Sequence, residues 1–373
     1  MMQDSLMRLL QRSYAFDHRW KYEAATPGWS REIWAQFAEI GLLALPFTSE
    51  SGGLDGTPVD TMIVMEQLGR HITLEPYLST IVMAGGILRR AASTEQHESI
   101  STKVIDGSLI VSLAHTERGT FGSPSRVGTQ AVRSGDLWQI SGHKSCVLHG
   151  DSADLLIISA RTSGAPSDAK GITLFAVDPR ATNINIQSYA LHDGQRASDI
   201  QINSVLVPHS ALIGCVDDGF RILQSAEYET LAAVCAEAVG VMSELHQMTV
   251  DYLKQRKQFG VPIGNFQALQ HRAADMYIAL EQARSMAMYA AMMSQADDKT
   301  AIAQAVSSAK VQIGRSAKLI GEEAVQMFGG IGVTMEFKAG HYFKKLTLLE
   351  QFLGHADHHL ELLTSGPGLF ELE

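Results

Sequence analysis

Two short blocks in the last third of the chain carry residue types suited to phosphate chemistry. Residues 256–264 read RKQFGVPIG, and residues 326–334 read QMFGGIGVT. The guanidinium of Arg256 offers forked donors to phosphate oxygens, and paired glycines let a backbone approach a diphosphate closely. Taken alone, the GGIG run would be an ordinary helix end and turn. The two blocks together favour a site for a phosphate-bearing cofactor.

A second group of reactive residues lies near the C-terminus, in the sequence HADHH at 355–359. His355 and His359 are four residues apart, a spacing that places two imidazoles on one face of a helix and suits zinc. A solvated helix face is the alternative interpretation. We expect no metal site here.

Three segments that differ in composition and in the spacing of their apolar residues must position these residues. Residues 1–107 are helical, with periodic stretches at 29–41 and 59–69, and Ser30 is a candidate N-cap. Residues 108–212 hold six short β-branched segments, at 109–115, 137–144, 154–162, 172–178, 184–192 and 200–208, separated by turn residues, which predicts a small barrel or sandwich. Residues 213–373 return to helices. The apolar stripes run through 231–252 and 302–327, and a third long helix is predicted over 266–293, so this part forms a bundle. The predicted fold class is therefore α+β.

Composition and charge restrict the partners. The net charge is −10 and the hydrophobic fraction is 45%, typical of a globular protein and unsuited to nucleic acid. No stretch of 18 apolar residues exists, so no membrane span is expected. Cys146, Cys215 and Cys235 are widely spaced and match no zinc or redox motif, which favours reduced thiols and a cytoplasmic location.

The helix–sheet–helix order and the RKQFG, QxxGG and LAHTERG (113–119) elements resemble the acyl-CoA dehydrogenase family over nearly the whole chain. The nearest likeness is to small subunits of pimeloyl-CoA dehydrogenase. The resemblance implies bound FAD, an acyl-CoA substrate, α,β-desaturation as in fatty acid β-oxidation, and an acceptor such as electron-transfer flavoprotein. It also implies a homo- or hetero-tetramer, in which a large acyl-CoA dehydrogenase subunit is one candidate partner.

The resemblance assigns the FAD-binding residues in two groups. Contacts to the flavin and its loop are expected from Leu113, His115, Thr116 and Ser123. Contacts to the FAD of a neighbouring subunit are expected from Arg256, Phe259, Gln267, Gln326, Gly329 and Gly330. The sequence departs from the family where a Trp-x-Thr usually covers the flavin, because Cys146, Val147 and Leu148 stand there. His149, one position further, should face the opposite side of the strand.

The resemblance also requires a carboxylate base for the α-proton of the thioester. The usual glutamate near the C-terminus is replaced by Leu353 or Gly354. The alternative family position falls on Thr230, and Glu229 beside it is our candidate base, although one residue rotates a helix by roughly 100°. An ion-paired Glu229 is the competing interpretation. Glu237 is expected to be partnered or solvated rather than catalytic.

Two hypotheses therefore remain open. In the first, the chain is a self-sufficient FAD-dependent acyl-CoA dehydrogenase, with a dicarboxylyl-CoA such as pimeloyl-CoA as one candidate substrate. In the second, it is a non-catalytic subunit that completes the flavin site of a heterotetramer. A related oxidase or monooxygenase on the same fold is a third and weaker interpretation.

Overall fold

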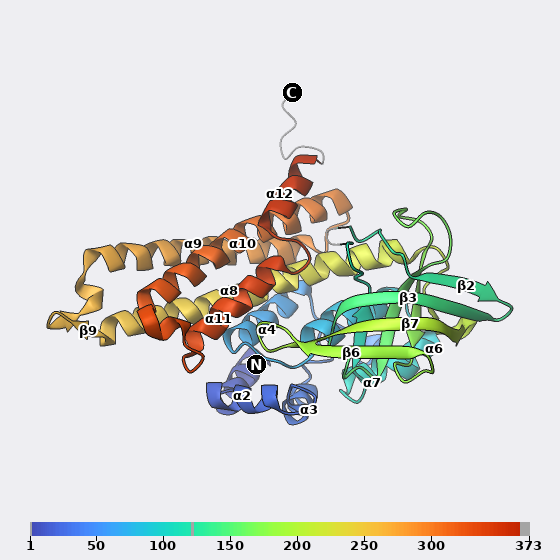
Figure 1. Ribbon diagram of the computed structural model, residues 1–373, viewed down its shortest axis with the longest axis horizontal. Helices are drawn as coiled ribbons and strands as arrows, with labels where there is room; N and C mark the ends of the chain where they lie inside the picture. Colours follow the sequence, from blue (N-terminus) through green and yellow to red (C-terminus); the bar gives the residue numbers. More distant parts are fainter. Residues whose placement is uncertain (1, 121–122, 366–373) are drawn as a thin grey trace.

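The computed structural model describes residues 2–120 and 123–365 and has three parts in chain order (Figure 1). A helical part comes first, a β-sheet follows, and a bundle of long helices ends the chain. In Figure 1 the bundle extends away from the sheet, and the N-terminal helices lie beneath both. This is the helix–sheet–helix order that the sequence predicts.

The N-terminal part consists of helices with clear local start signals. The main elements are α1 (Met2–Ser13), α2 (Phe16–Ala24), α3 (Arg31–Glu39), α4 (Pro58–Arg70), the π-helix η2 (Tyr77–Ala84) and α5 (Gly85–Ala91). Four shorter helical segments lie between or after them: η1 (Ser49–Ser51), α6 (Thr94–Gln96), η3 (His97–Ser101) and α7 (Thr102–Ile105). The Ser30 hydroxyl accepts a hydrogen bond from the Ile33 amide, which confirms the predicted N-cap of α3. Thr57 and Asp60 form a capping box at the start of α4.

The middle part is one mixed sheet. Its strands are β1 (Val111–Ala114), β2 (Gln130–Ser134), β3 (Leu137–Leu148), β4 (Leu155–Arg161), β5 (Ile172–Val177), β6 (Ile184–Ala190), β7 (Arg196–Pro208) and β8 (Leu212–Ile213). They are ordered β6-β7-β3-β2-β4-β5-β8, and β1 pairs in parallel with β4. Six of these strands were predicted. Strand β2 was missed, because four of its five side chains are exposed and it lacks an apolar alternation.

The C-terminal part contains α8 (Gly219–Gln255), α9 (Gln267–Met293), α10 (Lys299–Phe328), α11 (Lys338–Gln351) and α12 (Ala356–Ser365), with the small elements β9 (Lys257–Gln258), β10 (Val261–Pro262), η5 (Ile263–Asn265) and η6 (Gly329–Val333) between them. The predicted apolar stripe of α10 is buried along its whole length from Ile302 to Met327. The stripe of α8 is buried from Leu231 to Leu245 and becomes half-buried at Met248 and Tyr252. The periodicity therefore predicted the inner faces of both helices.

Helices α4 and α8 meet backbone to backbone through two glycines. A Cβ atom on Gly69 would collide with the carbonyl oxygen of Glu237, and one on Gly240 would collide with that of Glu66. No side chain fits at either position. This contact fixes α8 against the N-terminal part.

A buried ion cluster holds the three parts together. Lys345 of α11 lies 3.2 Å from Asp193, in the turn between β6 and β7, and 2.7 Å from Glu237 of α8. Arg19 of α2 donates to the carbonyl oxygens of Asp193 and Ile72. Glu237 is thus a partnered glutamate, as expected. The cluster sets the position of the sheet relative to the bundle, and therefore the space between them.

Candidate functional site

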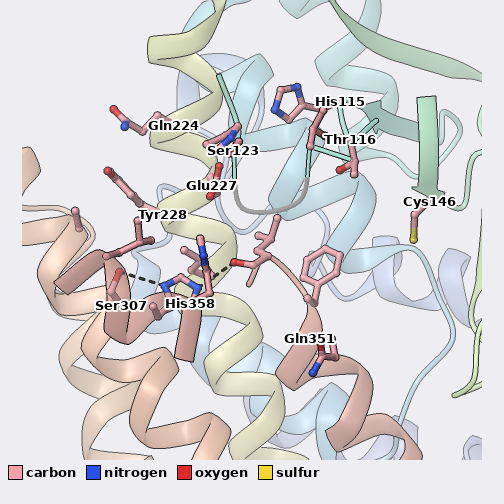
Figure 2. A pocket seen from close by; sticks show the side chains of 18 of the residues that line it. His115, Thr116, Ser123, Cys146, Gln224, Glu227, Tyr228, Ser307, Gln351 and His358 are labelled. Carbon is pink, nitrogen blue, oxygen red and sulfur yellow. Dashed lines mark hydrogen bonds between the residues drawn. The ribbon is translucent and has the colours of Figure 1, made fainter. Parts of the chain in front are cut away.

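A cavity of about 530 Å³ lies between the sheet and the bundle (Figure 2). One wall comes from the loop after β1 and from the end of β3. The other comes from the first half of α8, the first half of α10, the 351–354 turn and α12. Most lining side chains are apolar, with a few amides, hydroxyls and imidazoles among them. This size and lining are typical of a small-molecule site.

Glu227 is the carboxylate that faces this cavity. It projects from α8 toward the loop after β1 (Figure 2), and in the described part of the chain it makes no hydrogen bond or ion pair. Burial raises the pKa of Glu227 to about 7. An unpartnered carboxyl group poised near neutrality in a cavity is suited to moving a proton.

Glu229, the candidate base from the sequence, lies elsewhere. Its carboxylate pairs with Arg89 and, at 2.7 Å, with Arg90, both on α5, and it does not line the cavity. Two residues along a helix correspond to about 200° of rotation, so Glu227 and Glu229 point to opposite sides of α8. The structure therefore agrees with the competing interpretation of the sequence, in which Glu229 is ion-paired. The sequence contained the signal for Glu227, because it precedes Thr230 by one helical turn.

A smaller pocket of about 50 Å³ adjoins the main cavity beside Glu227. Its inner wall consists of Met83 from η2 and of Leu223, Ala226 and Thr230 from α8. Leu113 closes it from the side of the sheet. All of these side chains are apolar except Thr230, whose hydroxyl donates to the Ala226 carbonyl oxygen. The inner part of the small pocket is therefore apolar, while His115, Thr116, Ser145 and Cys146 line its side toward the sheet.

The loop after β1 brings together the four residues expected to contact the flavin. Leu113, His115 and Thr116 line the small pocket, and His115, Thr116 and Ser123 line the main cavity. The His115 Nδ1 atom lies 2.8 Å from the Ser159 hydroxyl. Burial, aided by the nearby Lys144 ammonium, lowers the pKa of His115 to about 3, so this imidazole is neutral.

A buried ion pair supports this loop from beneath. Lys144 of β3 is fully buried, and its Nζ atom lies 2.7 Å from the Glu117 carboxylate and 3.2 Å from the His115 carbonyl oxygen. Although partial burial acts against it, the Lys144 charge lowers the pKa of Glu117 to about 2. The pair fixes the loop to β3, and so fixes the position of Thr116.

The end of β3 carries the departure from the usual flavin-covering residues. Cys146 and Leu148 line the cavity, while Val147 is buried in the core of the sheet. His149 faces the other way, within 3.0 Å of the Ser79 hydroxyl and the Leu74 carbonyl oxygen, which confirms the predicted orientation. In this region the wall offers a thiol and an isobutyl group.

The turn at 351–354 closes the cavity opposite the loop. Leu353 adopts a φ of 55°, and a Cβ atom on Gly354 would meet the His358 ring at 2.5 Å. The His359 Nε2 atom lies 3.0 Å from the Leu353 carbonyl oxygen, and its Nδ1 atom lies 3.2 Å from the Ser307 hydroxyl. Leu353 lines the cavity at the position where the resemblance places a glutamate.

The C-terminal histidines belong to this wall. Both ring nitrogens of His359 lie within hydrogen-bonding distance of protein atoms, and burial lowers its pKa to about 4. Across residues 2–120 and 123–365, no group of three His, Cys, Asp or Glu side chains is arranged so that it could hold a metal ion. His358 lines the cavity beside it.

The remaining six expected FAD contacts lie far from the cavity. They gather at the end of the bundle remote from the sheet, where the Tyr252 ring of α8 packs on Phe328 at 4.8 Å (Figure 1). All six side chains or glycines are exposed: Arg256, Phe259, Gln267, Gln326, Gly329 and Gly330. The expected FAD contacts thus form two separate groups, which a single chain does not bring together.

The fold and cavity define a three-part protein with a neutral, largely apolar site between sheet and bundle. Three consecutive family descriptions match the chain: acyl-CoA dehydrogenase N-terminal domain over residues 1–108, middle domain over 112–205 and C-terminal domain over 217–366. The chain belongs to the acyl-CoA dehydrogenase family, whose members bind FAD.

Individual relatives agree with this assignment. The chain is similar to human mitochondrial short-chain specific acyl-CoA dehydrogenase, with 26% identity over 85% of this chain and 78% of that protein. It superposes on a chain of the ChsE4-ChsE5 complex of Mycobacterium tuberculosis with a TM-score of 0.88 and 23% identity, covering 98% and 97% of the two chains. The FAD complex of PigA gives a TM-score of 0.89 and 24% identity, covering 98% and 96%. The last two likenesses concern the fold.

No helix in the described ranges is both long enough and apolar enough to cross a membrane.

Proposed function

We propose that this protein is an FAD-dependent acyl-CoA dehydrogenase that desaturates the α,β bond of a CoA thioester. The observation that carries the proposal is Glu227, an unpartnered carboxyl group with a pKa of about 7 at the meeting point of the two pockets. Family membership supplies the reaction class, and this side chain supplies the group that the reaction needs.

The chemistry of the lining fits a flavin ring. Leu113 and Leu148 offer apolar surface, and Thr116 and the neutral His115 add hydrogen-bonding groups at the edge. The loss of the usual Trp-x-Thr residues reduces the cover over the ring without adding a charge. When bound, FAD supplies the acceptor for the β-hydride of the substrate.

Glu227 would remove the α-proton of the thioester. The carboxylate must be ionised to accept a proton, and a pKa near 7 leaves it partly ionised at neutral pH while keeping it basic. The proton would go to the carboxylate oxygen as the hydride leaves the β-carbon. Because Glu227 has no partner in the described chain, no ion pair lowers the pKa of its carboxyl group.

The separation of the two groups of expected FAD contacts supports assembly with a second subunit. The Phe259 side chain is 92% exposed, and a Cβ atom on Gly329 or Gly330 would meet no atom of the described residues within 4 Å. Exposed apolar side chains also gather on α9, among them Tyr277, Ile278 and Met292. These features support a homo- or hetero-tetramer in which Arg256, Phe259, Gln267 and the 326–330 turn complete a neighbour's FAD site.

The charge of the lining bears on the substrate. Among the described residues of both pockets, no lysine or arginine faces the cavity, so the ω-carboxylate of a dicarboxylyl-CoA such as pimeloyl-CoA would find no lysine or arginine as a counter-ion. This favours a neutral acyl group. Electron-transfer flavoprotein or a similar acceptor would be the partner that takes up the electrons. Fatty acid β-oxidation in the cytoplasm remains the expected setting.

A second candidate function is supported by a different observation. Leu353 occupies the turn where a catalytic glutamate is expected, and Glu227 lies about 5 Å along the helix from the alternative position at Thr230. A chain with this arrangement would serve as a flavin-completing subunit while a large partner subunit performs the reaction.

One experiment separates the two candidates. The chain is purified alone, and its visible spectrum is recorded under nitrogen before and after adding acyl-CoAs. A flavin band that bleaches in the wild type, and at least a hundredfold more slowly in Glu227→Gln, supports autonomous catalysis with this base. Bound flavin that no acyl-CoA bleaches, but that bleaches after co-expression with a large subunit, supports the partner role.

A further inference from the structure

A separate cavity of about 220 Å³ lies where the N-terminal helices meet the bundle. Among the described residues it shares no lining side chain with the two pockets beside Glu227. We propose that this cavity binds a small organic carboxylate. Arg70 and Lys338 would hold the charge of the ligand, and Leu10 and Phe16 would contact its apolar part. Such a site is independent of the proposed function.

The lining of this cavity combines apolar and charged side chains from five helices. Leu10 of α1 and Phe16 of α2 supply apolar surface. The end of α4, the second half of α8 and the start of α11 supply charged groups, namely Arg70, Glu244 and Lys338. Pockets for drug-sized ligands begin at roughly 300 Å³, so this smaller cavity suits a compact molecule. A ligand with one charged end and one apolar end matches both kinds of surface.

Arg70 is a cation with free hydrogen-bonding capacity. Its Nη2 atom donates to the Glu66 carboxylate at 3.2 Å, and its other guanidinium nitrogens make no hydrogen bond in the described part of the chain. Glu66 is shared, because the Arg284 Nη1 atom lies 2.7 Å from the same carboxylate oxygen. Arg284 also lies 3.5 Å from the solvent-exposed Glu281. The Arg70 side chain is 31% exposed, so a second carboxylate can approach its guanidinium and accept from it.

Lys338 supplies a second cation from the start of α11. Its Nζ atom lies 3.4 Å from the Glu244 carboxylate, and both side chains are partly exposed. A pair of this kind contributes little to stability, so the ammonium can turn toward a ligand at small cost. Tyr342, one turn further along α11, donates its hydroxyl hydrogen to the Arg70 carbonyl oxygen at 2.6 Å. That bond holds the start of α11 against the end of α4, and so keeps both cations at one cavity.

Two other basic side chains of the lining are not available to a ligand. The buried Arg19 guanidinium pairs with Glu23 at 2.9 Å. It also donates to the carbonyl oxygens of Ile72 and Asp193. Burial lowers the pKa of His71, so its imidazole is neutral at pH 7. Through Arg19, the cavity is joined to the buried ion cluster at Asp193.

The remaining charges leave a place for one negative group. Arg70 and Lys338 carry two positive charges, and Glu244 carries one negative charge. Glu66 and Arg284, which do not line the cavity, cancel one another. One positive charge is therefore left over in the lining, and a monocarboxylate would neutralise it.

Benzoate tests the site, because it joins one carboxylate to a compact apolar ring. It is titrated calorimetrically into the purified protein, and the melting temperature is recorded over the same range of concentrations. We expect saturable binding that raises the melting temperature, since the ligand binds the folded state. Benzamide has the same shape and no charge. We expect it to bind about tenfold more weakly or worse, because the charge-assisted hydrogen bonds are lost.

Matched variants locate the binding site. Arg70→Gln should weaken benzoate binding by about tenfold or more, because its charge-assisted hydrogen bonds are lost. Glu244→Gln should strengthen binding by about threefold, because it removes the like charge beside the ligand. Glu227→Gln is the control in the main cavity, and it should leave benzoate binding unchanged. If Arg70→Gln does not fold, judged by its melting without benzoate, the partly exposed Lys338→Gln takes its place and should weaken binding by about threefold.

The assignment is overturned if benzoate does not bind at millimolar concentrations, or if benzamide binds as tightly. It is also overturned if the substitutions of Arg70 and Glu244 leave benzoate binding unchanged. Binding that is lost in Glu227→Gln would place benzoate in the main cavity, which would contradict the assignment equally. None of these results bears on the proposed function, because that function is tested separately by bleaching of the flavin.

Discussion

Replacing Glu227 by glutamine should make the protein more stable at alkaline pH, even though it removes the proposed base. The glutamine has the same shape and no charge. Burial raises the pKa of Glu227 from 4.5 to about 7, which means that the folded state favours the protonated form. The stability that this group contributes is full below pH 4.5, and it is lost as pH rises through 7.

The magnitude follows from the size of that shift. About 2.5 pKa units at 1.36 kcal/mol per unit give an upper limit of about 3.4 kcal/mol in the free energy of unfolding. Glu227 is only partly buried and lines a cavity that extends to exposed residues, so solvent screening reduces the expected difference to about 2 kcal/mol. Wild type and Glu227→Gln should therefore have similar stability at pH 5, and the variant should exceed the wild type at pH 8.

The assay is urea unfolding at pH 5, 6, 7 and 8, followed by circular dichroism. Glu229→Gln is the contrast, because it is only two residues away on the same helix. Its loss leaves Arg89 and Arg90 without their carboxylate, so it should destabilise the protein by about 3 kcal/mol at every pH. If Glu227→Gln is the destabilised variant at pH 8, or if the two variants behave alike, the assignment of Glu227 to the cavity and Glu229 to the ion pairs is wrong.

Three further expectations concern other parts of the molecule. Burial lowers the pKa of His149 to about 4, so the stability that this group contributes is full above pH 6.5 and is lost as pH falls through 4. His149→Gln should therefore flatten the pH dependence of the urea midpoint between pH 6.5 and 4, and an unchanged slope would contradict this. Gly240→Ala should destabilise the protein by about 2 kcal/mol or more, although alanine is the better helix former, because its methyl group would collide with the Glu66 carbonyl oxygen; a higher melting temperature would refute the close contact. Phe259→Asp should change the unfolding free energy of the single chain by less than about 0.5 kcal/mol, because this side chain is exposed. It should reduce assembly, measured by light scattering, and FAD content, measured by the flavin-to-protein absorbance ratio. Unaltered assembly and flavin content would count against the proposed interface.

Patterns with a period were readable from the sequence. The stripe from Ile302 to Met327, the cap at Ser30 and six strands follow from local patterns, and each of them is found in the structure. The α–β–α order followed from these local patterns. The sequence predicted a small barrel or sandwich, and the middle part is a single mixed sheet. The order of the strands could not be predicted, because strand pairing depends on contacts between residues distant in sequence.

The side of α8 that meets the sheet was harder to predict. Glu227 and Glu229 both lie in the first third of the helix among apolar residues, and apolar spacing alone does not show which of them faces the cavity, although Glu227 shares a face with Thr230. Arg89 and Arg90, which hold Glu229, lie about 140 residues away in the chain. A long-range ion pair of this kind leaves no periodic signal. The resemblance already divided the expected FAD contacts into two groups, and the structure places these groups apart in one chain.

The contact between Gly69 and Gly240 has a consequence for how this family of active sites can change. Because two bare backbones touch there, α8 cannot turn about its axis by one residue without driving a side chain into α4. A carboxylate can therefore reach the two pockets only from the face of α8 that lines them, at positions such as 224, 227 and 231, which are three or four residues apart. On the other side of this helix an acidic group takes a structural role, such as the ion pairs of Glu229 and Glu237.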